Sequence, residues 1–200
     1  MALIAVQETM FSDTSATAIG PWLKISAGKK QGQKSGVAFY VAPQNRSAVL
    51  NYKTVSDRII TLTMLTKSGP CVFINNHTPM EKGTTLIEKQ RHWDTLAHIL
   101  NKIPKDHMII LMGDFNLRWH GRHDSEKDVL GPHIFGMGTE YLVSHSHHNR
   151  DLGLELFRSH KLTFLNSHFA KPQASKVTFR KPGVLLSDPI SCLLYTSDAA

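Results

Sequence analysis

The sequence predicts an α/β protein of layered architecture, built as a single domain. Several short apolar runs rich in β-branched residues are separated by turn residues, which is typical of strands. One longer segment instead has apolar residues at three- and four-residue spacing, which is typical of a helix with one buried face. The chain has 200 residues, of which 41% are hydrophobic. We find no internal repeat or low-complexity segment, so this length provides for one sizeable core.

The first 41 residues are predicted to hold two strands. Residues 2–6 form a short apolar strand that delivers the carboxylate of Glu8 directly after its end. Residues 11–34 contain several glycines and are predicted to be a loop with one short apolar piece at 22–25. Residues 35–41 form the next strand.

A hairpin and a helix follow. Residues 58–65 alternate apolar and polar side chains, and a turn at 67–70 leads into a second strand at 71–75. Residues 84–103 form the clearest helix, which ends at Pro104. The apolar stripe of this helix is expected to lie on a sheet, and it consists of Leu86, Ile87, Trp93, Leu96, Ala97, Leu100 and Ile103.

The most informative segment is the apolar run 108–112, which stops abruptly at Gly113 and is followed by Asp114 and Asn116. The run predicts a strand buried on both faces. A carboxylate at the end of such a strand has no structural use, and ligand sites of layered α/β proteins gather where strands end. The carboxylate suits a metal ion or a water proton, and the carboxamide suits an oxyanion. The alternative is an Asx-turn that only shapes the loop.

The remaining residues give weaker patterns. Residues 117–148 are polar and rich in Gly and His, which predicts a long functional or mobile loop. Residues 151–160 predict a short helix, and residues 162–165 and 176–180 predict two further strands.

The chain is basic, with 23 Lys and Arg against 16 Asp and Glu and a formal net charge of +7. Many of the cations lie in two loop-like segments, namely Lys24, Lys29, Lys30 and Lys34 in one, and Lys171, Lys176, Arg180 and Lys181 in the other. This balance favours a polyanionic partner such as nucleic acid. The alternative is a basic surface that serves only solubility.

Hydropathy and cysteine usage bear on the cellular compartment. No apolar run approaches the roughly 20 residues that cross a bilayer, and the N-terminus lacks the features of a secretory signal. The two cysteines, Cys71 and Cys192, are too few for a disulfide scaffold. Cys71 opens an apolar strand, so we expect a reduced, buried thiol. We therefore expect an intracellular, reducing location, and a nuclear or nucleic-acid-associated one for a eukaryotic parent protein.

Five short motifs follow one another along the chain: Gln7-Glu8-Thr9, Ser35-Gly36-Val37-Ala38, Asn75-Asn76-His77-Thr78-Pro79, Gly113-Asp114-Phe115-Asn116 and Thr178-Phe179. In this order they resemble the endonuclease/exonuclease/phosphatase superfamily. Four further segments are Asp57-Arg58-Ile59-Ile60, Leu130-Gly131-Pro132, Asn149 to Leu156 and Leu165-Asn166-Ser167-His168-Phe169. These resemble the apurinic-like endonuclease domain of non-long-terminal-repeat retrotransposons and its craniofacial-development-protein-like relatives. The resemblance covers residues 2–184 and implies a four-layer sandwich of two packed mixed β-sheets flanked by helices, here incomplete.

The resemblance also implies a magnesium-dependent attack of water on a phosphodiester, with Mn²⁺ as an alternative ion. By position, Glu8 would be the magnesium ligand. Asp114 would orient the attacking water, and Asn116 would hydrogen-bond a phosphate oxygen as charge builds in the transition state.

Three more residues are candidates by position. His77 stands where apurinic endonucleases commonly carry a tyrosine. As an imidazolium it would donate to a phosphate or protonate a leaving oxygen, and a hydrogen-bonded structural histidine is the alternative. Arg180 and Lys181 would contact the DNA backbone, with ordinary solvated charges as the alternative.

The sequence departs from the family pattern in two places. An asparagine on a strand upstream of Glu8 is absent, and so is a C-terminal Asp-His pair whose histidine is the general base. The segment Cys192-Leu193-Leu194-Tyr195-Thr196-Ser197 matches the translation of a sequencing-library adapter, with a terminal strand as the alternative. The predicted organisation is therefore a partial endonuclease/exonuclease/phosphatase domain over residues 1–190 and an artefact over residues 191–200.

Together these observations predict a fragment of the magnesium-dependent DNA endonuclease of a retrotransposon. Little or no activity is expected, because removal of a general base costs orders of magnitude in rate. Two alternatives stay open: an inositol-phosphate or phospholipid phosphatase of the same superfamily, and a non-catalytic DNA-binding module. The predicted partner is DNA and not a membrane, and the oligomeric state is left open.

Overall fold

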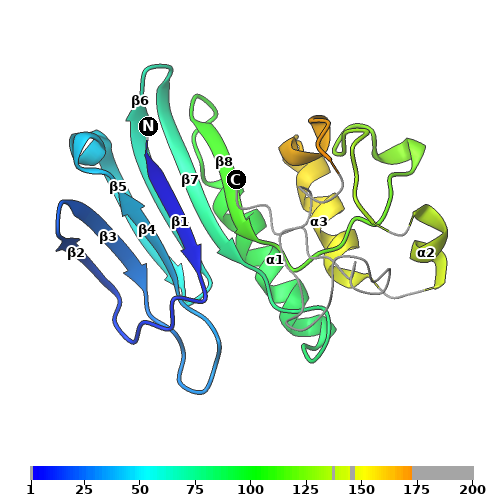
Figure 1. Cartoon of the computed structure of the whole chain (residues 1–200), viewed down its shortest axis with the longest axis horizontal. Coiled ribbons are helices and arrows are strands. Elements are labelled where there is room, and N and C mark those ends of the chain that lie inside the picture. Colours follow the sequence, from blue (N-terminus) through cyan, green and yellow to red (C-terminus); the bar gives the residue numbers. More distant parts are fainter. Residues whose placement is uncertain (1, 137, 145–146, 173–200) are drawn as a thin grey trace. The chain divides into compact units, whose positions relative to one another are not determined.

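The computed structural model describes residues 2–136, 138–144 and 147–172. These residues divide into two compact units (Figure 1). Of the described residues, the first unit comprises 2–78 together with Lys102–Asp114, and the second comprises Pro79–Asn101 together with those from 115 to 172. Both sheets belong to the first unit, and the described helices α1, α2 and α3 belong to the second.

The first sheet consists of β1 (Leu3–Gln7), β2 (Ser15–Ile19), β3 (Trp22–Ala27) and β4 (Val37–Val41), in the order β1-β4-β3-β2. All of its described pairings are antiparallel. The strands predicted at 2–6 and 35–41 are confirmed. The loop predicted over residues 11–34 is wrong, because β2 and β3 form a hairpin within it. The physical reason is that β2 is an exposed edge strand made mostly of small and polar residues. Its sequence therefore lacks the alternation of apolar and polar residues by which a strand is recognised.

The second sheet consists of β5 (Val49–Ser56), β6 (Ile59–Thr66), β7 (Gly69–His77) and β8 (Met108–Asp114), in the order β5-β6-β7-β8. The predicted hairpin is confirmed, since β6 and β7 pair in antiparallel register. β7 and β8 run parallel, so this sheet is mixed. The 3₁₀ helix η1 (Pro43–Ala48) lies between β4 and β5 along the chain.

The two sheets pack face to face, as predicted for a sandwich. Their shared core contains Ile25, Val37, Phe39 and Val41 from the first sheet and Ile60, Leu62, Met64, Cys71 and Phe73 from the second. Cys71 is a free, fully buried thiol, as predicted, and its burial raises its pKa. The prediction that residues 108–112 are buried on both faces is wrong. Met112 packs against the core, but Met108 and Ile110 are exposed, and in the described residues β8 pairs only with β7.

The second unit contains α1 (Leu86–Asn101), α2 (Thr139–Ser144) and α3 (His148–Ser159), with short 3₁₀ turns at η2 (Asp124–Glu126) and η3 (Leu165–His168). Both predicted helices are confirmed as α1 and α3. The strand predicted at 162–165 is wrong, because Phe164 makes only an isolated bridge to Leu130 before the chain enters η3. The strand predicted at 176–180 lies outside the described residues.

Helix α1 begins with a capping box. The Glu88 carboxylate accepts a hydrogen bond from the Thr85 N–H at 2.9 Å, and the Thr85 hydroxyl accepts one from the Glu88 N–H at 3.2 Å. Leu86 and Ile87, predicted to be buried, lie in this first turn and are exposed. The buried stripe is Lys89, His92, Trp93, Leu96 and Leu100.

The core of the second unit is aromatic, with ring contacts among Trp93, Phe115, Trp119, Phe157 and Phe164. Helices α1 and α3 come close at Gly153, where an added Cβ would lie 3.1 Å from the Trp93 ring. The segment predicted to be a polar, mobile loop at 117–148 supplies several buried side chains to this core, so it is a packed connection. These side chains include Leu117, Trp119, Val129 and Leu130. Among the described residues, no helix has the length and hydropathy needed to cross a membrane.

Candidate active site

The two sheets are joined at one end by a buried carboxamide. Asn75 on β7 donates from Nδ2 to the carbonyl of Val6 at 3.1 Å and to that of Ala38 at 2.9 Å, which are register partners on β1 and β4. Its Oδ1 accepts a hydrogen bond from Gln7 Nε2 at 2.6 Å. Because Asn75 is fully buried, losing it would leave several polar groups without partners. This contact fixes the end of β1 over the end of β7.

The same face of β7 carries His77. Side chains two residues apart on a strand point to the same face, so His77 faces the first sheet as Asn75 does. In the parallel pairing His77 is the register partner of Asp114 on β8, which places both side chains on that face. The Thr78 N–H donates to the Asp114 carbonyl at 2.8 Å and continues the pairing beyond the strands.

Glu8 enters this site from the end of β1. Its Oε1 lies 3.7 Å from His77 Nε2, and its side chain is 57% exposed. The backbone of Glu8 has φ 51, a left-handed conformation that is costly for a residue other than glycine and is often found at functional sites. The first unit therefore brings together three of the predicted site residues: Glu8, His77 and Asp114.

The His77 ring is buried and neutral at neutral pH. Burial lowers its pKa, the nearby Arg58 guanidinium lowers it further, and Asp57 opposes them, with a result of about 4. The expected imidazolium is therefore wrong for this structure. A neutral imidazole still offers one N–H donor and one acceptor nitrogen.

Gly113 allows β8 to approach β7 at the site. Its φ is +128, and an added Cβ would lie 1.9 Å from the Asn76 carbonyl oxygen. No side chain can occupy that space, so the glycine is required for Asp114 to reach its place beside His77.

A basic loop lies beside Glu8. The segment between β3 and β4 contains Lys29, Lys30 and Lys34, and it is tied to the chain after Glu8 by the Thr9 N–H, which donates to the Gly36 carbonyl at 3.1 Å. Lys30 lies 3.6 Å from the buried Asp57 carboxylate but is itself 69% exposed. Lys24, which the sequence grouped with these cations, is instead buried on β3.

Asn116 lies in the second unit. It has φ 45 and is 6% exposed. Its carbonyl accepts a hydrogen bond at 3.2 Å from Asn149 Nδ2, which also donates to the Pro79 carbonyl at 2.8 Å, while Asn149 Oδ1 accepts one from Trp93 Nε1 at 3.1 Å. The loop that carries Asn116 is thus held by a buried carboxamide, as the end of β1 is held by Asn75.

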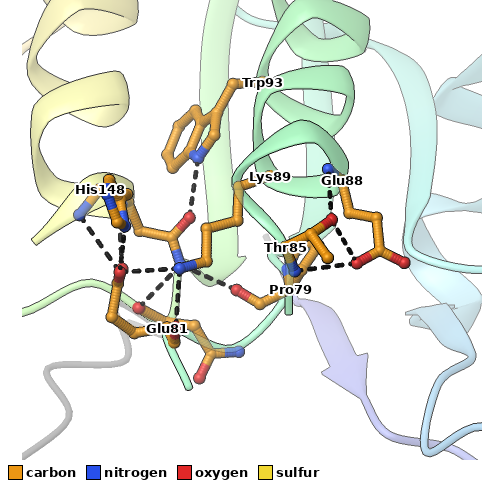
Figure 2. A network of polar contacts seen from close by, with 9 residues as sticks. Pro79, Glu81, Thr85, Glu88, Lys89, Trp93 and His148 are labelled. Atoms are coloured by element: carbon orange, nitrogen blue, oxygen red, sulfur yellow. Dashed lines mark hydrogen bonds and ion pairs between the residues drawn. The ribbon is translucent and has the colours of Figure 1, made fainter. Parts of the chain in front are cut away.

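A charged network adjoins Asn149 (Figure 2). The buried Lys89 ammonium donates to the Glu81 carbonyl and to Glu81 Oε1, both at 2.7 Å. The Glu81 carboxylate also accepts the first N–H groups of α3, from His148 at 3.2 Å and from Asn149 at 2.9 Å. Burial raises the pKa of Glu81, but the hydrogen bonds from Lys89, Asn149 and His148 lower it more, so the net shift is downward.

The donor groups of the first unit suit Mg²⁺. This ion keeps several waters and takes one or two carboxylates together with substrate phosphate oxygens. The exposed carboxylate of Glu8 fits such a sparse site. Among the described residues no group of three or more His, Cys, Asp or Glu could hold a metal ion, and Mg²⁺ does not need such a cage. The other predicted DNA contacts, Arg180 and Lys181, lie outside the described residues.

Sequence reasoning missed that Arg58 lies against His77, since the Asp57-Arg58 pair was noted only as part of a family motif. The signal was available, since a cation at the turn before β6 must lie beside the end of β7 once the hairpin forms.

The first unit is a sandwich of two β-sheets. At neighbouring strand ends it holds a cluster of two carboxylates, Glu8 and Asp114, and the imidazole of His77. No protein-family model matches the chain. The chain is 25% identical over 175 residues to Craniofacial development protein 2 of Bos taurus, a match that covers 84% of this chain and 26% of that protein. The same identity, length and coverage of this chain apply to Craniofacial development protein 2 of Tragulus javanicus, of which 27% is covered.

These matches confirm the predicted resemblance to craniofacial-development-protein-like proteins. The chain spans about a quarter of the length of these curated relatives. Among solved structures, humanized D. rerio TDP2 with 14 mutations aligns at a TM-score of 0.40 and 13% identity, over 50% of this chain and 44% of that chain. D. rerio TDP2 complexed with a single strand DNA product aligns at a TM-score of 0.40 and 16% identity, over 49% of this chain and 40% of that chain.

Proposed function

We propose that this chain carries part of a site for Mg²⁺-dependent phosphodiester hydrolysis in DNA, as in the endonuclease of a retrotransposon. The observation that supports the proposal is the convergence of Glu8, His77 and Asp114 on one face of the β7–β8 end. The sequence relationship to craniofacial-development-protein-like proteins supports the same class.

Each site residue has a separate task. Glu8 would hold Mg²⁺, which when bound supplies positive charge at a phosphate oxygen. Asp114 accepts a hydrogen bond from the attacking water and orients it. The neutral His77 donates one hydrogen bond to a phosphate oxygen as negative charge builds.

DNA is favoured as the substrate because of the basic loop beside Glu8. Lys29, Lys30 and Lys34 lie in a segment whose end is hydrogen-bonded to Thr9, the residue after the proposed metal ligand. Fixed cations near the reacting phosphate hold the neighbouring phosphates of a strand, and such binding weakens as salt rises. A small phosphomonoester would make no use of cations spread along a loop.

The test measures binding before turnover. Labelled duplex DNA is titrated with the chain in Mg²⁺ and in EDTA, and the fluorescence anisotropy is recorded. We expect Mg²⁺-dependent binding that Glu8→Gln weakens by about tenfold or more, since an ion at a phosphate oxygen contributes several kcal/mol. The matched control is Glu155→Gln, which neutralises an exposed carboxylate on α3 and leaves binding unchanged.

Nicking of supercoiled plasmid in Mg²⁺ then reports turnover, and Asp114→Ala must abolish any nicking. DNA binding that ignores both EDTA and Glu8→Gln would contradict the proposal and select a non-catalytic DNA-binding module. Hydrolysis of a soluble inositol phosphate without affinity for DNA would select the phosphatase instead.

A further inference from the structure

The turn before β6 brings Arg58 against His77. The Arg58 carbonyl accepts a hydrogen bond from the His77 N–H at 2.9 Å. The Arg58 side chain returns to the same residue, with Nη1 3.3 Å from His77 Nδ1 and 3.5 Å from the His77 carbonyl oxygen. Backbone and side chain together therefore fix the guanidinium at the Nδ1 edge of the ring.

This contact decides where the ring carries its proton. A guanidinium has only donors, so the nitrogen that it contacts must be the acceptor. An imidazole nitrogen that accepts a hydrogen bond carries no proton. The neutral ring of His77 then has its proton on Nε2, the atom that lies 3.7 Å from Glu8 Oε1.

We infer that Arg58 is a positioning residue that locks His77 in the Nε2–H tautomer and aims this N–H at the Glu8 carboxylate and at any phosphate oxygen beside it. His77 is then a hydrogen-bond donor. With its proton on Nε2, it can neither ligate a metal ion nor accept a proton through that nitrogen. The part of this inference that concerns phosphate rests on the proposed function, and the tautomer lock does not.

The position of Arg58, and not only its positive charge, determines its effect on the His77 ring. Lys30 adds a cation to the same turn through Asp57, at 3.6 Å, but it is the Arg58 guanidinium that lies 3.3 Å from His77 Nδ1. The gap of 3.7 Å between Nε2 and Glu8 is longer than a direct hydrogen bond, so a water or a phosphate oxygen fits there as the acceptor.

The test is nuclear magnetic resonance of the ¹⁵N-labelled chain at neutral pH, without metal or DNA. The Nε2–H form is also favoured for histidine in water, so the tautomer alone is a weak test. The decisive signal is scalar coupling across the hydrogen bond between Arg58 Nη and His77 Nδ1. The His77 ring signals are identified by their loss in His77→Gln.

We expect a protonated Nε2, an unprotonated Nδ1 and this coupling in the unmodified chain. Arg58→Met should abolish the coupling and shift the Nδ1 resonance toward that of a nitrogen without a donor. Lys30→Met removes the other cation of the turn and should leave both signals unchanged. A protonated Nδ1, or an Nδ1 resonance that Arg58→Met does not move, overturns the inference.

The unmodified chain decides the question even where Arg58→Met fails to fold, because absence of the coupling there overturns the lock. The outcome is also separable from the proposed function. If the Arg58–His77 coupling is observed but DNA binding does not depend on Mg²⁺, only the proposed function is overturned. DNA binding and nicking by a chain that lacks the lock overturn this inference alone.

Discussion

The two compact units satisfy their buried polar groups in different ways. In the first unit, strand ladders pair most of the backbone, and the buried ionisable His77 stays neutral. In the described residues of the second unit, the long connections form no strand ladder, and buried cations donate hydrogen bonds to their carbonyls instead. Lys89 binds the Glu81 carbonyl, and Arg150 binds the carbonyls of Trp119 and Gly121 at 3.1 and 3.2 Å.

The difference follows from the cost of unpaired backbone groups. A buried carbonyl needs a donor, and irregular backbone cannot supply one from a neighbouring strand. A buried cation needs a counter-charge in turn, which Glu81 provides for Lys89 and Glu126 for Arg150. The first unit should therefore be most sensitive to backbone shape, and the second to single charged side chains.

The largest effect is expected at Gly113 in the first unit. Gly113→Ala places a methyl group 1.9 Å from the Asn76 carbonyl oxygen at φ +128. We expect a loss of more than about 4 kcal/mol in the free energy of unfolding, measured by urea titration with circular dichroism. Gly20→Ala is the control, because φ is +54 there but nothing lies within 4 Å, so about 1 kcal/mol is expected. Equal losses for the two variants would contradict the close approach of β8 to β7.

The next effect concerns Arg150 in the second unit. Its side chain is 5% exposed, and its Nη2 lies 2.7 Å from Glu126 Oε2. Arg150→Met leaves Glu126 buried without its cation, and we expect a loss of roughly 3–5 kcal/mol in the free energy of unfolding. The measurement is urea unfolding followed by tryptophan fluorescence.

Arg158→Met is the matched control for Arg150→Met. Arg158 lies on the same helix and pairs with Asp128 at 2.8 Å, but both side chains are 49% exposed. Solvent screens such a pair, so little change in stability is expected. An Arg158 effect as large as that of Arg150 would contradict the role assigned to buried cations.

A third prediction is that the first unit loses stability in weak acid through His77. The pKa of His77 is about 4 in the folded chain, against the ordinary histidine value of 6.5. Between these values the unfolded chain binds a proton that the folded chain does not, so stability falls as pH falls. The shift corresponds to roughly 3 kcal/mol. In metal-free buffer, His77→Gln should remove this part of the pH dependence, and an unchanged slope between pH 6.5 and 4 would refute it.

The smallest effect is expected from Glu81 in the second unit, at lower pH. Its pKa is lowered from 4.5 in the folded chain, so the stability that it contributes is present above 4.5 and is lost as pH falls through the lower folded value. Glu81→Gln should flatten this decline. Hydrogen exchange of the α3 amides measures this loss of stability at the start of the helix, because the Glu81 carboxylate accepts hydrogen bonds from the His148 and Asn149 N–H groups. If the exchange of the α3 amides rose equally with acid in the unmodified chain and in Glu81→Gln, Glu81 would not stabilise the start of the helix.

Local pattern predicted much of the fold. The β6–β7 hairpin and α1 were readable because apolar periodicity and turn residues act over a few neighbours. β2 was missed because its identity as a strand depends on β3 and not on its own side chains. Leu86 and Ile87 were misassigned because the capping box sets where the first turn lies. The loop over 117–148 was misjudged because its few aromatic and aliphatic residues pack tightly although its composition is polar.

The sequence by itself determined which chemical groups stand at the strand ends: Glu8 after β1, His77 at the end of β7 and Asp114 at the end of β8. These positions follow from local patterns. Only the tertiary structure decided that the three share one face, because sheet register and the Asn75 contact join segments far apart in the chain. It also decided the state of His77, since burial and the Arg58 guanidinium make the ring neutral, and no local pattern encodes either of them.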